Sequence, residues 1–131
     1  MGLFDSMFGR NNEAGDKESR SVPWIPLVSL GQLEDIIAAS NQKTQVIFKH
    51  STSCGISRMV MNMFGSSYDF EANQIDLHYL DLHAYRAVSN EVAHRFGVMH
   101  QSPQLLVIRN GVVVGHASHG AIIAMKLERY F

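Results

Sequence analysis

In the first half of the chain, the spacing of apolar residues predicts a helix, a buried strand and a second helix. Ser29 and Gln32 form a capping-box pair, and apolar residues at helical spacing follow them. The run 45–49 is β-branched and aromatic without turn residues, which is typical of a strand buried on both faces. Beyond the polar loop that ends at Cys54, a second helical stripe predicts a helix. Its buried side is expected to consist of Ile56, Met59, Val60, Met63 and Phe64.

The next segment predicts another strand and another helix. Residues 75–82 alternate between apolar and polar side chains, which favours a strand. Residues 88–96 carry apolar side chains at helical spacing. Ser89 is the candidate N-cap of that helix, and Gly97 lies just past its end.

Two further strands are predicted to form a hairpin. The apolar runs 104–108 and 112–117 are joined by Asn110-Gly111, a strong hairpin signal, so the two strands must be antiparallel. Apolar residues within 123–131 predict a C-terminal helix that packs on the sheet.

The order of these elements is βαβ followed by ββα, which predicts an α/β fold with a mixed central β-sheet flanked by helices. Among small folds, this order is that of the thioredoxin-like fold. Residues 11–21 are polar and lack apolar periodicity. We therefore expect a flexible N-terminal segment at 1–21 and a thioredoxin-like domain at 22–131.

Composition narrows the function classes. The chain has 131 residues, 46% hydrophobic and 18% charged, which suits one globular domain. A formal net charge of −1 gives no electrostatic basis for nucleic-acid binding, and no membrane span is predicted. One cysteine cannot form an internal disulfide, so we expect a cytoplasmic location. The seven histidines lack a zinc-ligand spacing beside that cysteine, so no metal site is predicted.

Cys54 is the candidate nucleophile, because a helix N-terminus stabilises the reactive thiolate. The alternative is a buried structural cysteine, but the flanking residues are mostly polar or small. Basic groups near it in sequence are candidates for tuning the thiolate: Lys49, His50 and Arg58. The active-site loop and helix start are assigned to Ser51, Thr52, Ser53, Gly55, Ile56 and Ser57.

Cys54 and Ser57 form a CxxS pattern, in which serine stands where a dithiol protein has its second cysteine. Because serine cannot attack a disulfide, exchange at Cys54 should stop at the mixed disulfide until another thiol arrives. Pro103 lies where thioredoxin folds carry a cis-proline facing the nucleophile. The neighbouring positions are the expected docking edge for an extended substrate: Gln101, Ser102 and Gln104.

Several sequence blocks carry a family resemblance, and they occur in order over about residues 22–131. The blocks are Phe48-Lys49-His50-Ser51-Thr52 before Cys54, Ile56-Ser57, Leu80-Asp81-Leu82, Arg86 with Ser89-Asn90, His100-Gln101-Ser102-Pro103-Gln104 and Ala117-Ser118-His119. In these blocks the chain resembles the monothiol bacilliredoxins of the bacillithiol system, the YtxJ family.

The resemblance implies a thioredoxin fold with Cys54 as the attacking thiol and Pro103 as the cis-proline beside it. It also implies that the substrates are S-bacillithiolated client proteins, with bacillithiol as thiol co-substrate and no permanently bound cofactor. Cys54 would take the bacillithiol cap, and an external thiol or a disulfide reductase would remove it.

One departure keeps an alternative open. Family members often carry proline after the cysteine, whereas this chain has Gly55, so residues 54–57 look like the CGFS string of monothiol glutaredoxins that carry iron–sulfur clusters. A third hypothesis is a thioredoxin-like interaction module without catalysis. His100 and His119 are interpreted as structural groups near the site, and the methionines at 59–63 as helix core.

Overall fold

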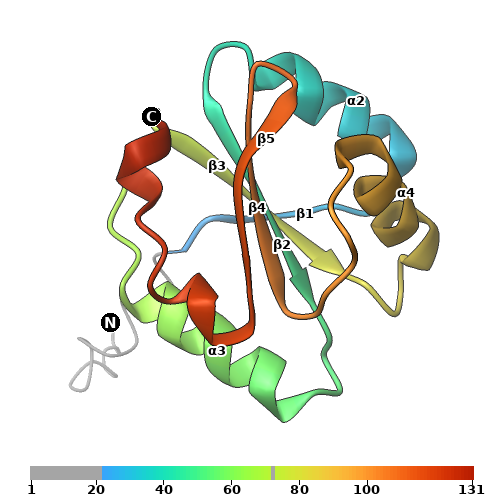
Figure 1. Ribbon diagram of the computed structural model, residues 1–131, viewed down its shortest axis with the longest axis vertical. Coiled ribbons are helices and arrows are strands. Elements are labelled where there is room, and N and C mark those ends of the chain that lie inside the picture. The colour runs from blue at the N-terminus through green and yellow to red at the C-terminus, as the bar shows by residue number, and fades with distance from the viewer. Residues whose placement is uncertain (1–21, 72) are drawn as a thin grey trace, which may run out of the picture.

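The computed structural model describes residues 22–71 and 73–131, and these form a five-stranded mixed sheet in the order β1-β3-β2-β4-β5. The predicted flexible segment at 1–21 lies outside the described residues. The predicted mixed sheet is confirmed (Figure 1). The central strand β2 pairs parallel with β3 and antiparallel with β4. The strands are β1 (Trp24–Pro26), β2 (Thr44–His50), β3 (Ile75–Asp81), β4 (Gln104–Arg109) and β5 (Val112–Ser118).

The α-helices cover both faces of this sheet. Helices α2 (Leu30–Ala39) and α4 (Arg86–Phe96) lie together on one face, and α3 (Gly55–Ser66) lies on the other (Figure 1). Successive residues of β2 alternate between the two faces, so Phe48 packs in the core with α3 and Ile47 in the core with α2 and α4. All seven residues of β2 are buried, which confirms the burial on both faces predicted for 45–49 and extends it by one residue at each end.

Several local signals in the sequence specify the structure that forms. The Ser29 hydroxyl accepts from the Gln32 N–H, and the Gln32 side chain accepts from the Ser29 N–H, which completes the capping box of α2. Asn110 and Gly111 have φ of 54° and 80°, as a tight turn between β4 and β5 requires. Gly97 ends α4 with φ of 67°, in the left-handed region.

The predicted N-cap of α4 is wrong. The helix begins at Arg86, and Ser89 is buried inside it with its N–H donating to the Tyr85 carbonyl at 3.0 Å. The preceding turn is stabilised instead by the Asp81 carboxylate, which accepts from the N–H groups of His83 and Ala84. The N-cap residue of α4 is Tyr85, whose side chain makes no capping hydrogen bond, so a search for a capping side chain could not locate this helix start.

The predicted C-terminal helix is also wrong, because the segment forms two 3-10 helices, η1 (His119–Ile122) and η2 (Leu127–Tyr130). Ile122 and Leu127 both reach the core on the α3 side. Their spacing of five would put them on different faces of one continuous α-helix. Two short helices joined by a turn allow both side chains to be buried.

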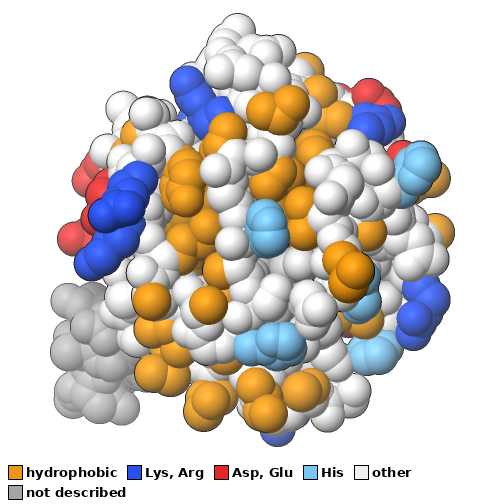
Figure 2. All heavy atoms as spheres, viewed as in Figure 1, with side chains coloured by type: hydrophobic (Ala, Val, Ile, Leu, Met, Phe, Trp, Pro, Cys, Tyr) orange, Lys and Arg blue, Asp and Glu red, His pale blue; other side chains and the backbone are white. Residues whose placement is uncertain are grey.

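The residues that α3 buries differ from those predicted for its buried stripe. Its buried residues are Ser57, Val60 and Phe64, whereas Ile56, Met59 and Met63 are 58%, 53% and 45% exposed. The two methionines are therefore not helix core. Figure 2 shows hydrophobic side chains gathered along the outer side of α3.

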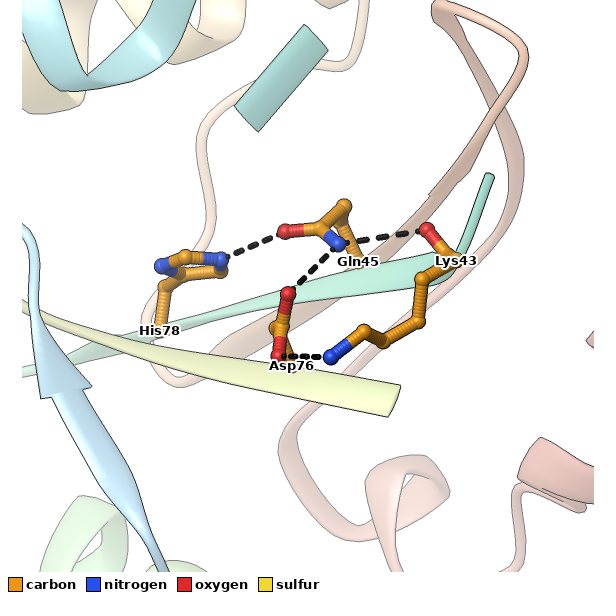
Figure 3. A network of polar contacts seen from close by, with 4 residues as sticks. All are labelled: Lys43, Gln45, Asp76 and His78. Atoms are coloured by element: carbon orange, nitrogen blue, oxygen red, sulfur yellow. Dashed lines mark hydrogen bonds and ion pairs between the residues drawn. The ribbon is translucent and has the colours of Figure 1, made fainter. Parts of the chain in front are cut away.

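A polar network occupies the end of the sheet where β2 and β3 begin (Figure 3). Asp76 accepts from Lys43 Nζ and from Gln45 Nε2, both at 2.9 Å. Because the Gln45 amide nitrogen donates to Asp76, its oxygen accepts from His78 Nε2 at 2.8 Å. His78 therefore carries a hydrogen on Nε2, and burial lowers its pKa to about 4, so the ring is neutral at pH 7.

We expect His78 to make the protein less stable in acid. Its pKa falls from 6.5 in the unfolded chain to about 4 in the folded one, so between these values the unfolded state binds more protons. Stability should fall as the pH drops from 6.5 to 4, with a slope of up to about 1.4 kcal/mol per pH unit. Urea unfolding at a series of pH values should show a shallower slope for His78→Gln. Equal slopes in the two proteins would contradict this account.

Candidate active site

Cys54 is the N-cap residue of α3, directly after the loop that follows the central strand. It is half-buried and its thiol is free. The Cys54 N–H donates to the Ser51 carbonyl at 3.2 Å, and its own carbonyl accepts from the Arg58 N–H at 3.1 Å. Among the described residues no side chain makes a capping hydrogen bond at this helix end, so the first-turn N–H groups near Cys54 have no competing side-chain acceptor there. The predicted position of the thiol at a helix start is confirmed.

The CxxS serine has a structural role. Ser57 is fully buried, and its Oγ accepts from the Ser51 N–H at 3.1 Å and lies 2.8 Å from His50 Nδ1. These contacts attach the first turn of α3 to the end of β2. Thr52 and Ser53 remain exposed, and Arg58 closes the loop from outside by donating to the Thr52 carbonyl at 3.1 Å.

Gly55 and Ile56 are exposed at the start of α3. A Cβ at position 55 would meet only Arg58 Nη2, at 3.9 Å, which is ordinary van der Waals contact. Glycine is therefore not sterically required, and proline is favoured at this first helical position in general. The backbone at Gly55 thus lies in a conformation that other residues can also adopt.

The three basic candidates for tuning the thiolate lie on different sides of the loop. Lys49 is fully buried on the α4 side of the sheet, where its Nζ lies 3.3 Å from His100 Nδ1. Burial lowers the pKa of Lys49 to about 8. His50 lies on the opposite side against Ser57, and burial lowers its pKa while the Asp81 carboxylate opposes that shift. Arg58 is on the outer surface.

The Ser102–Pro103 peptide bond is cis, and Pro103 is buried immediately before β4. Gln104, the first residue of β4, pairs with Lys49 of β2, so the proline segment and the cysteine loop lie at the same end of the sheet. The Gln104 side chain points inward and donates to the Met99 carbonyl at 2.9 Å. Gln101 is exposed and Ser102 is half-buried.

Sequence reasoning assigned no role to His83 and Arg86, which the fold brings to the cysteine loop. His83 Nε2 lies 2.9 Å from Ser51 Oγ, and Arg86 Nη2 lies 3.4 Å from His83 Nδ1. Both residues follow β3, and the parallel pairing of β2 with β3 places the ends of the two strands side by side. A signal in the sequence could have located these two residues at the site: two strands were expected to pair, and each of them ends in polar residues.

The comparisons with known proteins decide the family. The model of the family "Monothiol bacilliredoxin BrxC" matches residues 25–127. The chain belongs to the monothiol bacilliredoxin family. The family resemblance is thereby confirmed, and this family member is a thiol-disulfide oxidoreductase.

Solved structures agree on the fold. A protein assigned as an oxidoreductase with a thioredoxin fold is 30% identical, with a TM-score of 0.68 over 86% of this chain and 96% of that chain. Mitochondrial thioredoxin 3 from Saccharomyces cerevisiae is 16% identical, with a TM-score of 0.63 over 86% and 94%. Thioredoxin from Trypanosoma brucei brucei is 14% identical, with a TM-score of 0.61 over 83% and 88%. The thioredoxin-like α/β fold is confirmed.

Within residues 22–71 and 73–131, no three His, Cys, Asp or Glu side chains gather in a way that would hold a metal ion. In the same part of the chain, none of the helices has the length and apolar character needed to cross a membrane.

Proposed function

We propose that the protein removes bacillithiol from client proteins whose cysteines carry it as a mixed disulfide, and that Cys54 is the attacking thiol. The observation that carries this proposal is a free, half-buried cysteine at the uncapped start of a helix, in a chain with no second cysteine. The family match supplies the chemical context.

The reaction is a single disulfide exchange. The Cys54 thiolate attacks the sulfur of bacillithiol, the bond between that sulfur and the client sulfur breaks, and the client cysteine leaves as a thiolate that takes a proton from water. A Cys54–bacillithiol disulfide forms. An external thiol or a disulfide reductase then attacks the bacillithiol sulfur and restores Cys54. No net oxidation occurs in the first step.

The surrounding residues fit distinct tasks in this reaction. The segment of exposed Gln101 and half-buried Ser102, next to Pro103, offers an edge along which an extended client segment can dock as an added strand. Arg58 holds the cysteine loop in place by donating to the Thr52 carbonyl. The proposed setting is the cytoplasm, with S-bacillithiolated clients and bacillithiol as partners.

A comparison of two caps tests the proposed substrate. We expect the protein to free the thiol of a bacillithiol-capped client about tenfold faster than that of the same client capped with glutathione, because a dedicated site gains at least 1.4 kcal/mol from its own cap. Intact-mass analysis of client and enzyme gives both rates. Cys54→Ala is the control for uncatalysed exchange. Equal rates with both caps would contradict bacillithiol specificity and leave a general exchange protein.

Two measurements separate the other hypotheses. An iron–sulfur carrier would hold a coloured cluster that is lost in Cys54→Ala, so visible absorbance after anaerobic reconstitution tests that function. A module without catalysis would leave Cys54 unreactive toward disulfides. We expect a colourless protein with a reactive Cys54.

A further inference from the structure

Cationic and imidazole side chains lie next to one another on the α4 side of the sheet, at the end of the molecule that carries Cys54. Lys49 Nζ contacts His100 Nδ1 at 3.3 Å. Arg86 Nη2 contacts His83 Nδ1 at 3.4 Å, and His83 Nε2 contacts Ser51 Oγ at 2.9 Å. The pKa of His100 is lowered by partial burial and by the positive charges of Lys49 and Arg86, so these groups share one electrostatic neighbourhood.

The two cations fix the hydrogen positions of both imidazoles. Ammonium and guanidinium groups can only donate, so Nδ1 of His100 and Nδ1 of His83 are acceptors. Each neutral ring therefore carries its hydrogen on Nε2. His83 Nε2–H donates to Ser51 Oγ, whereas His100 is exposed and its Nε2–H is directed to no partner among the described residues.

Neither Lys49 nor Arg86 forms an ion pair within the described part of the chain. The ion pairs found there join Lys43 to Asp76, and Arg95 to Glu34 and Glu91, at other places on the surface. The nearby carboxylate of Asp81 accepts from the backbone N–H groups of His83 and Ala84. A fully buried ammonium whose partner is an imidazole costs stability, and such departures from good packing concentrate at functional sites.

We propose that Arg86 and His100 form a carboxylate-binding subsite for the low-molecular-weight thiol attached to Cys54, with Lys49 as the positioning residue behind His100. This inference rests on the proposed function. The guanidinium of exposed Arg86 suits a carboxylate, and His100 adds one donor. His83 connects Arg86 to Ser51, whose carbonyl accepts from the Cys54 N–H, so the subsite borders the loop that holds the thiol.

The test compares two small disulfides that differ in charge. Dithiodiglycolate carries two carboxylates, and 2-hydroxyethyl disulfide carries none. In each reaction the Cys54 thiolate attacks one sulfur, the S–S bond breaks, half of the reagent stays on Cys54 and the other half leaves as a thiolate. Intact-mass analysis gives the two rates, and their ratio measures recognition of the carboxylate.

We expect dithiodiglycolate to react about tenfold faster, since one charge-assisted hydrogen bond contributes at least about 1.4 kcal/mol. The ratio should fall with added salt and should fall about tenfold in Arg86→Gln and in Lys49→Met. Arg129→Gln, which removes an exposed arginine of η2, is the matched control and should keep the wild-type ratio.

The tautomer of His100 tests the positioning role of Lys49 independently of any reaction rate. Long-range ¹H–¹⁵N NMR should show His100 as the Nε2–H tautomer in the wild type and as a mixture of tautomers in Lys49→Met. An unchanged tautomer in the variant would overturn the positioning role.

The outcomes distinguish this inference from the proposed function. If Cys54 reacts with both disulfides at equal rates, the subsite is wrong and the exchange function stands. If Cys54 reacts with neither, the exchange function is wrong and the subsite falls with it.

Discussion

In a single turnover without added thiol, the bacillithiol cap should move from the client to Cys54 and stay there. The only other group at the dithiol position is the Ser57 hydroxyl, which is fully buried between the Ser51 N–H and His50. A hydroxyl in that position has neither the acidity nor the access to attack a disulfide. Intact-mass analysis should show one cap gained by the enzyme for each cap lost by the client.

Variants at the two positions make this prediction sharper. Cys54→Ser should abolish the transfer, whereas Ser57→Ala should retain it. Ser57→Ala should also lower the free energy of unfolding by about 1–3 kcal/mol, because a buried N–H and an imidazole lose their partner. The transfer must therefore be measured where both variants are folded. A client freed of its cap with no mass gained on the wild-type enzyme would contradict the monothiol mechanism.

Replacing Lys49 by methionine should stabilise the protein while it weakens recognition of anionic disulfides. Lys49 is fully buried, and its pKa falls from 10.5 to about 8, so at pH 7 the folded state holds a charge at a cost of up to about 3 kcal/mol. Methionine fills a similar volume without a charge. Guanidinium unfolding at pH 7 should show a gain of about 1–3 kcal/mol.

The pH dependence of the stability tests independently whether the buried charge of Lys49 destabilises the folded state. The folded state binds the Lys49 proton less tightly than the unfolded state, so wild-type stability should rise as the pH increases from 8 to 10.5. Lys49→Met should lack this rise. Lys126→Met, at an exposed lysine, serves as the control and should change stability by less than about 0.5 kcal/mol. A Lys49→Met protein less stable than the wild type at pH 7 would contradict the account.

The sequence predicts those features whose cause is local. The capping box at Ser29 and Gln32 and the turn at Asn110-Gly111 each depend on residues that are close together in the sequence. The structure therefore contains both as predicted. The thiol at the start of α3 was predicted for the same reason, since the change from a β-branched run to a helical stripe marks the junction.

Features that depend on distant partners could not be predicted in this way. The stripe on α3 was misplaced because Ser57 is buried by contacts with β2, whereas Ile56 and Met59 face outward. β1 was not predicted, since its three residues follow one proline, end in another and carry no strand signal until β3 pairs with them. The contact of Lys49 with His100 spans 51 positions, and only the fold brings the two together.

The two edges of the sheet bear on how this protein behaves at high concentration. An unpaired edge strand can template pairing with another chain and so begin aggregation. Here β1 is three residues long and ends in Pro26, which cannot donate a ladder hydrogen bond, and the pairing of β4 with β5 is interrupted by a register shift between Val107 and Ile108. Both edges are therefore poor templates, and this disfavours edge-to-edge aggregation as the protein concentration rises.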